Sequence, residues 1–233
     1  MAELNFNGLN ETRAKYYLDW LKKYFYGVYS EEEVEHRFFN SLEYLNKDWE
    51  NRPSEIEFYK NTNYYIFNLL YWHSMNAKID VMQELQVFFK DAKTILDYGC
   101  GIGVDSNELI KLGHKVLSVD FDCPSMDVGI KLHPKVDFWS LDRMNLKGNF
   151  DLVLAMDLIG HVPDVQDILD RLISYTDKYL VIGLDLCCFD TQPMHHEENA
   201  EWQTKTQTYL EEQGFELIGQ VENNIVMRKK DGN

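Results

Sequence analysis

The chain has 233 residues, of which 45% are hydrophobic and 14% aromatic, a composition that is typical of a folded globular protein. Its 39 acidic and 23 basic residues give a formal net charge of −16, and the excess of acids is concentrated in residues 94–233. This charge disfavours nucleic acid as a partner, because a phosphate backbone would be repelled.

The longest apolar stretches are far shorter than the roughly 18–20 residues that a membrane-spanning helix requires, and the first residues do not resemble a secretory signal. We therefore expect a cytoplasmic protein with no membrane partner. The four cysteines, Cys100, Cys123, Cys187 and Cys188, are interpreted as reduced thiols. Because cysteine and histidine pairs at zinc-ligand spacing are missing, no metal is predicted.

Residues 1–93 are predicted to be helical, because apolar residues recur there at helical spacing. Two capping boxes, Ser30 with Glu33 and Ser54 with Glu57, indicate where helices begin. The region is crowded with tyrosine and tryptophan, most of which we interpret as core. Its position before the first strand suits a cap or lid over a ligand site.

From residue 94 onwards, short apolar runs alternate with helix-like segments, a pattern that predicts a doubly wound, mostly parallel α/β sheet. The expected strands are 94–98, 115–119, 135–139, 150–156, 178–184, 215–221 and 224–229. Only two residues separate the last two strands, so they must form an antiparallel hairpin, since a parallel crossover needs about a dozen residues or more. We expect a helical region, 1–93, followed by an α/β domain, 94–233.

A glycine-rich turn follows the first predicted strand. Asp97 precedes Gly99, Gly101 and Gly103, which stand at alternate positions. Glycines let a ligand approach the bare backbone, and the amides of the following helix point at the same place. The spacing differs from the G-x-G-x-x-G of dinucleotide binders. A carboxylate at position 97 suits an ammonium group and would repel a pyrophosphate.

Three further acids follow predicted strands. Asp120 ends the second strand, where a carboxylate can accept hydrogen bonds from both hydroxyls of a ribose. Asp142 follows the third strand, and Asp157 ends the fourth. Because the carboxyl ends of parallel strands meet at one edge of the sheet, we expect these acids to surround a cationic nucleoside.

With these motifs, residues 94–230 resemble the class I S-adenosylmethionine-dependent methyltransferases, and the stretch from Asp157 through His161 to Asp164 resembles their small-molecule branch. The resemblance implies a seven-stranded sheet, S-adenosylmethionine as the cofactor and S-adenosylhomocysteine as the product. It implies the following cofactor-binding residues: Asp97, Gly99, Cys100, Gly101, Gly103, Asp120, Phe121, Asp142, Arg143, Met156 and Asp157.

The same resemblance implies a role for each part of this set. The three glycines form the floor beneath the methionine part, with Asp97 at its ammonium group. Asp120 holds the ribose hydroxyls and Asp142 the adenine amino group, while Phe121 and Arg143 flank the adenine ring. The pair at 156–157 lies beside the amino-acid tail and the sulfonium.

Methyl transfer needs positioning more than catalytic groups, and a base helps only where the acceptor must lose a proton. The candidate bases are His161, His195 and His196, with His73 as a more distant option. The first could equally be structural, and the next two could be solvated loop residues. Cys187 and Cys188 are candidates for lining the acceptor pocket. Since hydrophobic closure excludes water and aromatic faces favour a cation, the lid candidates are Tyr64, Tyr65, Tyr71 and Trp72.

We therefore expect an enzyme that methylates an oxygen or nitrogen atom, or a carbon atom, of a small-molecule acceptor. The alternatives are a protein side-chain methyltransferase and a non-catalytic subunit that binds the same cofactor. A nicotinamide-dependent oxidoreductase is disfavoured by the glycine spacing and by the extra carboxylates. The acceptor and the oligomeric state are not predicted.

Overall fold

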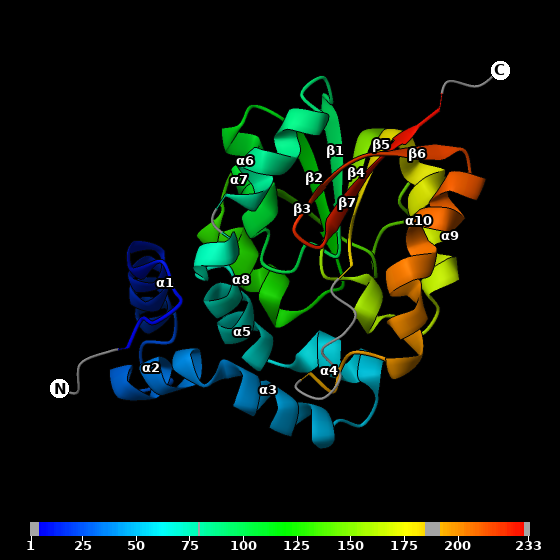
Figure 1. The fold of residues 1–233 in the computed structure, drawn as a ribbon. Coiled ribbons are helices and arrows are strands. Elements are labelled where there is room, and N and C mark those ends of the chain that lie inside the picture. The colour runs from blue at the N-terminus through cyan, green and yellow to red at the C-terminus, as the bar shows by residue number, and fades with distance from the viewer. Residues whose placement is uncertain (1–4, 79, 185–191, 231–233) are drawn as a thin grey trace. The chain divides into compact units, whose positions relative to one another are not determined.

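The computed structural model of the chain describes residues 5–78, 80–184 and 192–230. The chain divides into two compact units, Met1–Val81 and Met82–Asn233, which Figure 1 colours from blue to cyan and from cyan to red. In the described residues, no helix combines the length and the apolar character needed to cross a membrane.

The first unit is helical, as predicted. Its helices are α1 (Glu11–Tyr24), α2 (Glu31–Phe39), α3 (Ser41–Glu50), α4 (Glu55–Asn61), α5 (Tyr64–Trp72) and the 3-10 helix η1 (Asn76–Lys78). Both predicted caps form: the Ser30 hydroxyl accepts from the Glu33 amide at 3.1 Å, and the Ser54 hydroxyl accepts from the Glu57 amide at 3.3 Å. Each bond satisfies a backbone donor that the first helical turn leaves unpaired.

The second unit contains α6 (Val81–Leu85), η2 (Gln86–Phe88), β1 (Thr94–Tyr98), α7 (Val104–Lys111), β2 (Lys115–Asp120), α8 (Pro124–Leu132), β3 (Asp137–Ser140), β4 (Phe150–Ala155), η3 (Ile159–His161), α9 (Val165–Tyr175), β5 (Thr176–Gly183), η4 (Glu197–Glu201), α10 (Trp202–Glu212), β6 (Phe215–Val221) and β7 (Asn224–Lys229). The strands form one sheet in the order β3-β2-β1-β4-β5-β7-β6. Strands β1 to β5 pair in parallel, and β7 runs antiparallel to both of its neighbours. Helices cover both faces of the sheet (Figure 1). The doubly wound sheet and its terminal hairpin are therefore confirmed.

The stretch 82–93, which the sequence groups with the helical region, packs with the α/β unit. A Cβ atom added to Gly219 of β6 would lie only 2.2 Å from the ring of Phe88, so this aromatic ring rests directly on the strand. The Tyr179 hydroxyl of β5 donates to the Asp91 carboxylate at 2.8 Å. Because of these contacts, residues 82–93 belong to the second unit, and the boundary between the two units falls before residue 93. The role of the helical region as a cap stays a prediction.

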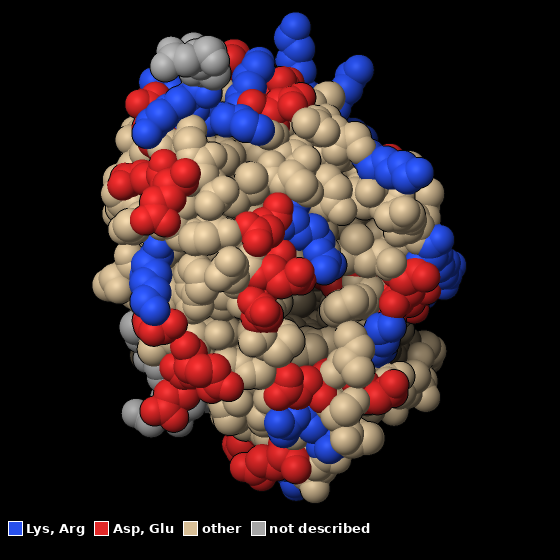
Figure 2. Space-filling view, turned by 90° about the vertical axis from the view of Figure 1, so that its right-hand side faces the viewer, with Lys and Arg blue, Asp and Glu red and all other residues tan. Residues whose placement is uncertain are grey.

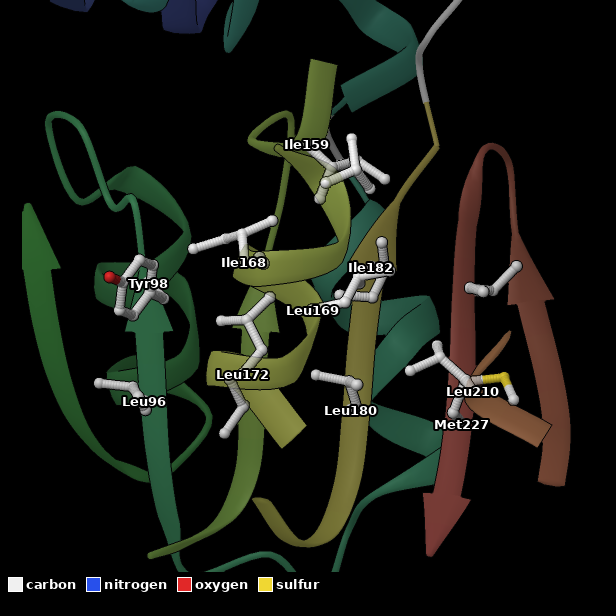
Figure 3. Packing of buried hydrophobic residues seen from close by; sticks show 14 of the residues in the cluster. Leu96, Tyr98, Ile159, Ile168, Leu169, Leu172, Leu180, Ile182, Leu210 and Met227 are labelled. Carbon is white, nitrogen blue, oxygen red and sulfur yellow. The ribbon is translucent and has the colours of Figure 1, made fainter. Parts of the chain in front are cut away.

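The main core of the second unit lies between the sheet and helices α9 and α10, and Figure 3 shows its side chains. Leu96 of β1 and Leu180 of β5 meet Leu169 and Leu172 of α9, and all four are fully buried. Each such leucine stabilises the fold by roughly 1.5–3 kcal/mol relative to an exposed position. The central strands are buried along nearly their whole length, which is why they read as continuous apolar runs.

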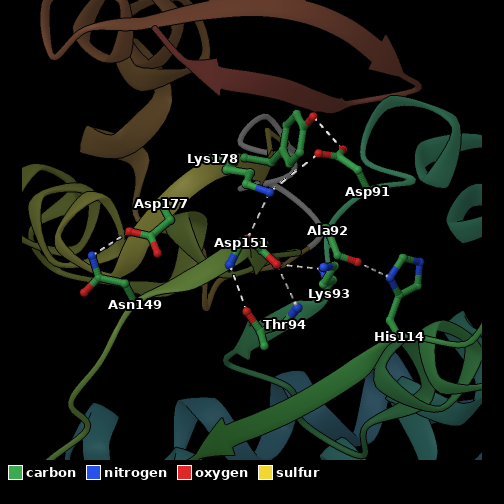
Figure 4. A network of polar contacts seen from close by, with 10 residues as sticks. Asp91, Ala92, Lys93, Thr94, His114, Asn149, Asp151, Asp177 and Lys178 are labelled. Atoms are coloured by element: carbon green, nitrogen blue, oxygen red, sulfur yellow. Dashed lines mark hydrogen bonds and ion pairs between the residues drawn. The ribbon is translucent and has the colours of Figure 1, made fainter. Parts of the chain in front are cut away.

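A polar network fastens the amino-terminal ends of β1, β4 and β5 (Figure 4). The Asp151 carboxylate accepts from the amides of Lys93 and Thr94 at 2.7 and 3.2 Å and lies 3.2 Å from the Lys178 ammonium group. Burial opposes the charge, but these donors together lower the pKa of Asp151 below its usual value. The network lies at the amino-terminal ends of these strands, whereas the glycine-rich turn follows the carboxyl end of β1.

Candidate cofactor and acceptor site

The glycine-rich turn links β1 to α7, and its backbone requires glycine. Gly99, Gly101 and Gly103 have φ angles of +77°, +53° and +73°, a left-handed region that other residues rarely adopt. Space is also limited, because a Cβ atom at Gly103 would lie 2.5 Å from Cζ of Phe138. Gly103 caps the start of α7, so the free amides of that helix face the turn.

Asp97 is buried beneath this turn. Its carboxylate accepts a hydrogen bond of 2.5 Å from the Ser106 hydroxyl, which lies 2.6 Å from the Ser118 hydroxyl. Burial raises the pKa of Asp97 to about 7, and repulsion from Asp105 and Asp120 adds to the shift, while the bond from Ser106 opposes it. A cation bound beside Asp97 would favour its charged form.

Asp120 joins the end of β2 to the glycine-rich turn. Its Oδ2 accepts from the Gly101 amide and its Oδ1 from the Phe121 amide, both at 2.7 Å. Burial raises the pKa of Asp120, although these two hydrogen bonds oppose the shift. Each carboxylate oxygen has a second lone pair, so the residue can accept from ribose hydroxyls while it holds the turn.

The third strand brings Asp142 to the same edge. Its carboxylate accepts from the Asp122 amide at 3.0 Å, and the Leu141 amide donates to the Asp120 carbonyl at 2.8 Å. Asp120 and Asp142 are therefore held at the ends of adjacent strands, as the sequence predicts. Asp142 and Arg143 are both exposed, and the Arg143 Nε donates to the Asp122 carboxylate at 2.6 Å.

Met156 and Asp157 follow β4 where it approaches β5 closely. A Cβ atom at Gly183 of β5 would lie 2.8 Å from the Asp157 backbone nitrogen and 3.2 Å from Oδ1 of Asn224. Asp157 has an exposed side chain and a φ angle of +50°, a conformation that costs most residues about 1–3 kcal/mol but that aspartate and asparagine tolerate better. The chain therefore makes a sharp, strained turn at the predicted sulfonium side of the site.

The three candidate histidines lie on two segments that meet. The rings of His161 and His195 are perpendicular, with centroids 4.3 Å apart, and the His196 amide donates to the Gly160 carbonyl at 3.0 Å. Burial lowers the pKa of His161 to about 3, and the neighbouring imidazoles of His195 and His196 contribute to the shift. His161 is thus neutral at physiological pH and a weak base. His73 ends α5 in the first unit.

Asn199 belongs to the same arrangement, although nothing in the sequence singles it out. It is buried, and its side-chain amide donates to the carbonyls of Ile159 and Val162 at 3.1 and 2.8 Å. Its partners stand about 40 positions earlier in the chain. No local spacing signal could reveal a contact of this kind.

Two of the four lid candidates pack against other aromatic residues of the first unit. The ring of Tyr64 is stacked on Tyr44, with centroids 5.3 Å apart, and the Arg37 guanidinium lies over Tyr64 at 5.3 Å. Tyr71 meets Phe38 edge to face at 5.5 Å. These contacts lie within the helical unit.

The other two lid candidates have similar surroundings. Tyr65 meets Phe58 at 5.8 Å between centroids, and the Lys78 ammonium group lies 5.0 Å from the Trp72 ring. A role in closing over a ligand stays a prediction for all four. Cys187 and Cys188 lie outside the described residues. Where the structure describes the chain, no cluster of three or more His, Cys, Asp or Glu side chains could hold a metal ion.

Comparison with known proteins agrees with this geometry. Residues 71–186, about half of the chain, match a family model described as a methyltransferase domain. The ubiquinone biosynthesis O-methyltransferase of Nitrobacter winogradskyi is 34% identical over 84 residues, which cover 33% of this chain and 32% of that protein. The mitochondrial ubiquinone biosynthesis O-methyltransferase of Schizosaccharomyces pombe is 30% identical over 118 residues, 44% of this chain and 42% of that protein. The chain thus matches less than half the length of these relatives.

Solved structures show the same fold. The magnesium protoporphyrin IX methyltransferase of Synechocystis PCC 6803 with bound S-adenosylmethionine superposes with a TM-score of 0.52 at 16% identity, over 72% of this chain and 85% of that one. The strand order, the antiparallel hairpin and the glycine-rich turn define a Rossmann-like methyltransferase fold. The chain belongs to the class I S-adenosylmethionine-dependent methyltransferases, whose cofactor is S-adenosylmethionine.

Proposed function

We propose that the protein transfers the methyl group of S-adenosylmethionine to an oxygen atom of a small-molecule acceptor. The observation that carries the proposal is the pair of acids, buried Asp97 and partly buried Asp120, on either side of the glycine-rich turn. Burial raises the pKa of both carboxyl groups, so the site favours a ligand that brings positive charge. S-adenosylmethionine carries an ammonium and a sulfonium group, whereas the pyrophosphate of a nicotinamide dinucleotide would be repelled.

The remaining cofactor contacts follow from the placement of the strand ends. We assign the cofactor ammonium group to Asp97, the ribose hydroxyls to Asp120 and the adenine amino group to Asp142, with Phe121 beside the adenine ring. We assign Arg143 to the other side of the ring. Its exposed ion pair with Asp122 contributes only about 0–1 kcal/mol, so the guanidinium can move at little cost.

The bound cofactor supplies an electrophilic methyl group on a positively charged sulfur. Transfer would break the sulfur–methyl bond as the oxygen–methyl bond forms, would release S-adenosylhomocysteine, and would require the acceptor hydroxyl to give its proton to a base. The protein has to align the two atoms and exclude water. His161 is a poor proton acceptor, because burial and the adjacent imidazoles lower its pKa to about 3. We assign it to the wall of the acceptor site and keep His195 and His196 as candidate bases.

Oxygen is favoured over nitrogen and carbon because the relatives are named as O-methyltransferases. We propose the helical unit, residues 1–81, as a cap with Tyr64, Tyr65, Tyr71 and Trp72 as lid residues, since this unit precedes β1. Acidic side chains are spread over much of the face drawn in Figure 2, and the net charge is −16. This charge supports a protein without a nucleic-acid partner or an anionic membrane surface as a partner, and we also propose a cytoplasmic location.

Calorimetric titration with S-adenosylmethionine, S-adenosylhomocysteine and NAD tests the cofactor site. We expect the first two ligands to bind and NAD not to bind, and Asp120→Ala to weaken binding by about 10-fold or more, because charge-assisted hydrogen bonds contribute roughly 1.5–3 kcal/mol. Asp177→Ala is the matched control, because Asp177 is an acid near the amino-terminal end of β5, whereas Asp120 lies at the carboxyl end of β2. Binding of NAD alone would contradict the proposal.

Methyl transfer is then measured with S-adenosylmethionine labelled in its methyl group. The acceptors are a catechol, 3,4-dihydroxybenzoate, and an aromatic amine of similar size. Incorporation into the catechol supports oxygen as the acceptor atom. Incorporation into the amine alone would move the assignment to nitrogen, and incorporation into neither, with the cofactor bound, would favour a protein acceptor or a non-catalytic subunit.

A further inference from the structure

Asn199 connects two segments of the second unit that are distant in the sequence. It stands in η4, immediately before α10, and its buried amide donates to the carbonyls of Ile159 and Val162 on either side of His161. The adjoining backbone makes a separate bond, from the His196 amide to the Gly160 carbonyl at 3.0 Å. Segment 192–199 is thereby fastened to the turn that follows β4.

The fastened turn belongs to the reacting side of the site. It begins at Asp157, whose backbone is left-handed, and it ends at His161, whose ring meets that of His195. Ile159 and Gly160 of this irregular turn are buried, so their carbonyls need hydrogen-bond donors. An asparagine amide has two N–H donors, and here its nitrogen lies 3.1, 3.5 and 2.8 Å from the carbonyls of Ile159, Gly160 and Val162 in one turn.

We propose that Asn199 is a positioning residue for methyl transfer, which holds the turn after β4 and with it His161 against segment 192–199. The proposal rests on the proposed function, because the acceptor is assigned to this side of the site. The side-chain hydrogen bonds of Asn199 go to the turn after β4 and not to the glycine-rich turn, so its loss should affect alignment of the acceptor more than binding of the cofactor.

Two substitutions separate positioning from general stability. Asn199→Ala removes both donors, and Asn199→Asp keeps the shape but turns a carboxylate towards two carbonyl oxygens. Thr176→Val is the matched control, because Thr176 is fully buried and its hydroxyl donates to the Leu172 carbonyl at 2.8 Å, at the opposite edge of the sheet. All three variants lose buried side-chain-to-backbone bonding.

For the Asn199 variants we expect kcat for 3,4-dihydroxybenzoate to fall by about 10-fold or more, because small displacements of reacting groups cost this much or more. The dissociation constant for S-adenosylhomocysteine should change by less than about 3-fold, since binding to Asp97 and Asp120 is retained. Thr176→Val should lower the melting temperature and leave kcat unchanged. In Asn199→Asp, activity relative to the wild type should recover as the pH is lowered, because a protonated carboxyl regains one donor.

Hydrogen–deuterium exchange of residues 158–162 gives a readout that needs no acceptor. Exchange should rise in both Asn199 variants and stay at the wild-type rate in Thr176→Val. The positioning role would be overturned if residues 158–162 of the Asn199 variants exchange at the wild-type rate. It would also be overturned if exchange is faster and kcat equals that of the wild type. A wild-type protein that binds S-adenosylmethionine and methylates no acceptor would instead count against the proposed function, and the exchange rates would then decide the role of Asn199.

Discussion

The carboxylate of Asp120 accepts a hydrogen bond of 2.7 Å from the backbone amide of Gly101, so the second strand of the sheet holds the glycine-rich turn that follows the first. One residue thus fixes the shape of the turn and faces the proposed ribose site. Removing the side chain would abolish both roles at once. Replacing one acceptor oxygen with a donor tests each role by its own measurement, the stability of the fold and the affinity for the cofactor.

Asp120→Asn is expected to weaken cofactor binding and to destabilise the fold. The amide keeps one acceptor oxygen, whereas its NH2 group faces a backbone amide and leaves that donor unpaired, at a cost of roughly 1–3 kcal/mol. Urea denaturation gives the change in the free energy of unfolding, and calorimetry with S-adenosylhomocysteine gives the affinity. A variant with unchanged stability would show that the bond between Asp120 and Gly101 does not support the turn.

Asp97→Asn should make the ligand-free protein more stable at pH 8 and weaken its binding of S-adenosylmethionine. Because burial raises the pKa of Asp97 from 3.8 to about 7, the folded protein binds more protons at this residue than the unfolded chain does, and stability falls as the pH rises from about 4 to about 7. The gain from the substitution at pH 8 is up to about 4 kcal/mol, at about 1.36 kcal/mol per pKa unit.

Urea denaturation of wild type and Asp97→Asn at pH 4 and pH 8 checks this sign. The two proteins should nearly converge at the lower pH, where the aspartate is protonated in the folded protein and roughly half protonated in the unfolded chain. Asp177→Asn, which changes an exposed acid, should show no such pH-dependent gain. A variant that is less stable than the wild type at pH 8 would mean that Asp97 is already compensated in the ligand-free protein.

Gly103→Ala should disrupt the cofactor site by two separable effects. The new methyl group would meet Phe138 at 2.5 Å, and the φ angle of +73° is unfavourable for alanine. Gly214→Ala is the matched control, because Gly214 has a φ angle of +87° with nothing within 4 Å of its Cβ position. We expect the control to lose about 1 kcal/mol and Gly103→Ala to lose more, together with cofactor binding. Equal losses in thermal denaturation would argue against the steric contact.

The local patterns predicted the elements and the strand-end positions of the candidate acids for clear physical reasons, whereas the role of these acids in cofactor binding stays a prediction. Strands buried on both faces appear as apolar runs, a two-residue link permits only a hairpin, and the strand ends place Asp120 and Asp142 together. The third strand begins at Asp137 rather than at residue 135, because the Val136 amide donates to the His133 carbonyl in a turn.

The acceptor half of the site was harder to predict from the sequence, because it depends on contacts between distant segments. The contact between His161 and His195, and the bonds of Asn199 to the turn after β4, join residues that no periodicity relates. The packing partners of the aromatic residues could not be predicted from the sequence either. Spacing shows that Tyr64 lies on a helix, but only the packing shows that it stacks on Tyr44.

Asp157 allows the strained backbone of the site to be tested apart from its charge. At a φ angle of +50°, asparagine should be tolerated, whereas a β-branched residue should not. We expect Asp157→Asn to keep the wild-type melting temperature and Asp157→Val to lose about 1–3 kcal/mol of stability. If the carboxylate also faces the cofactor, Asp157→Asn should weaken S-adenosylmethionine binding more than S-adenosylhomocysteine binding, because only the former carries the sulfonium charge. If Asp157→Asn binds each ligand with the same affinity as the wild type does, the role of Asp157 is confined to the backbone conformation.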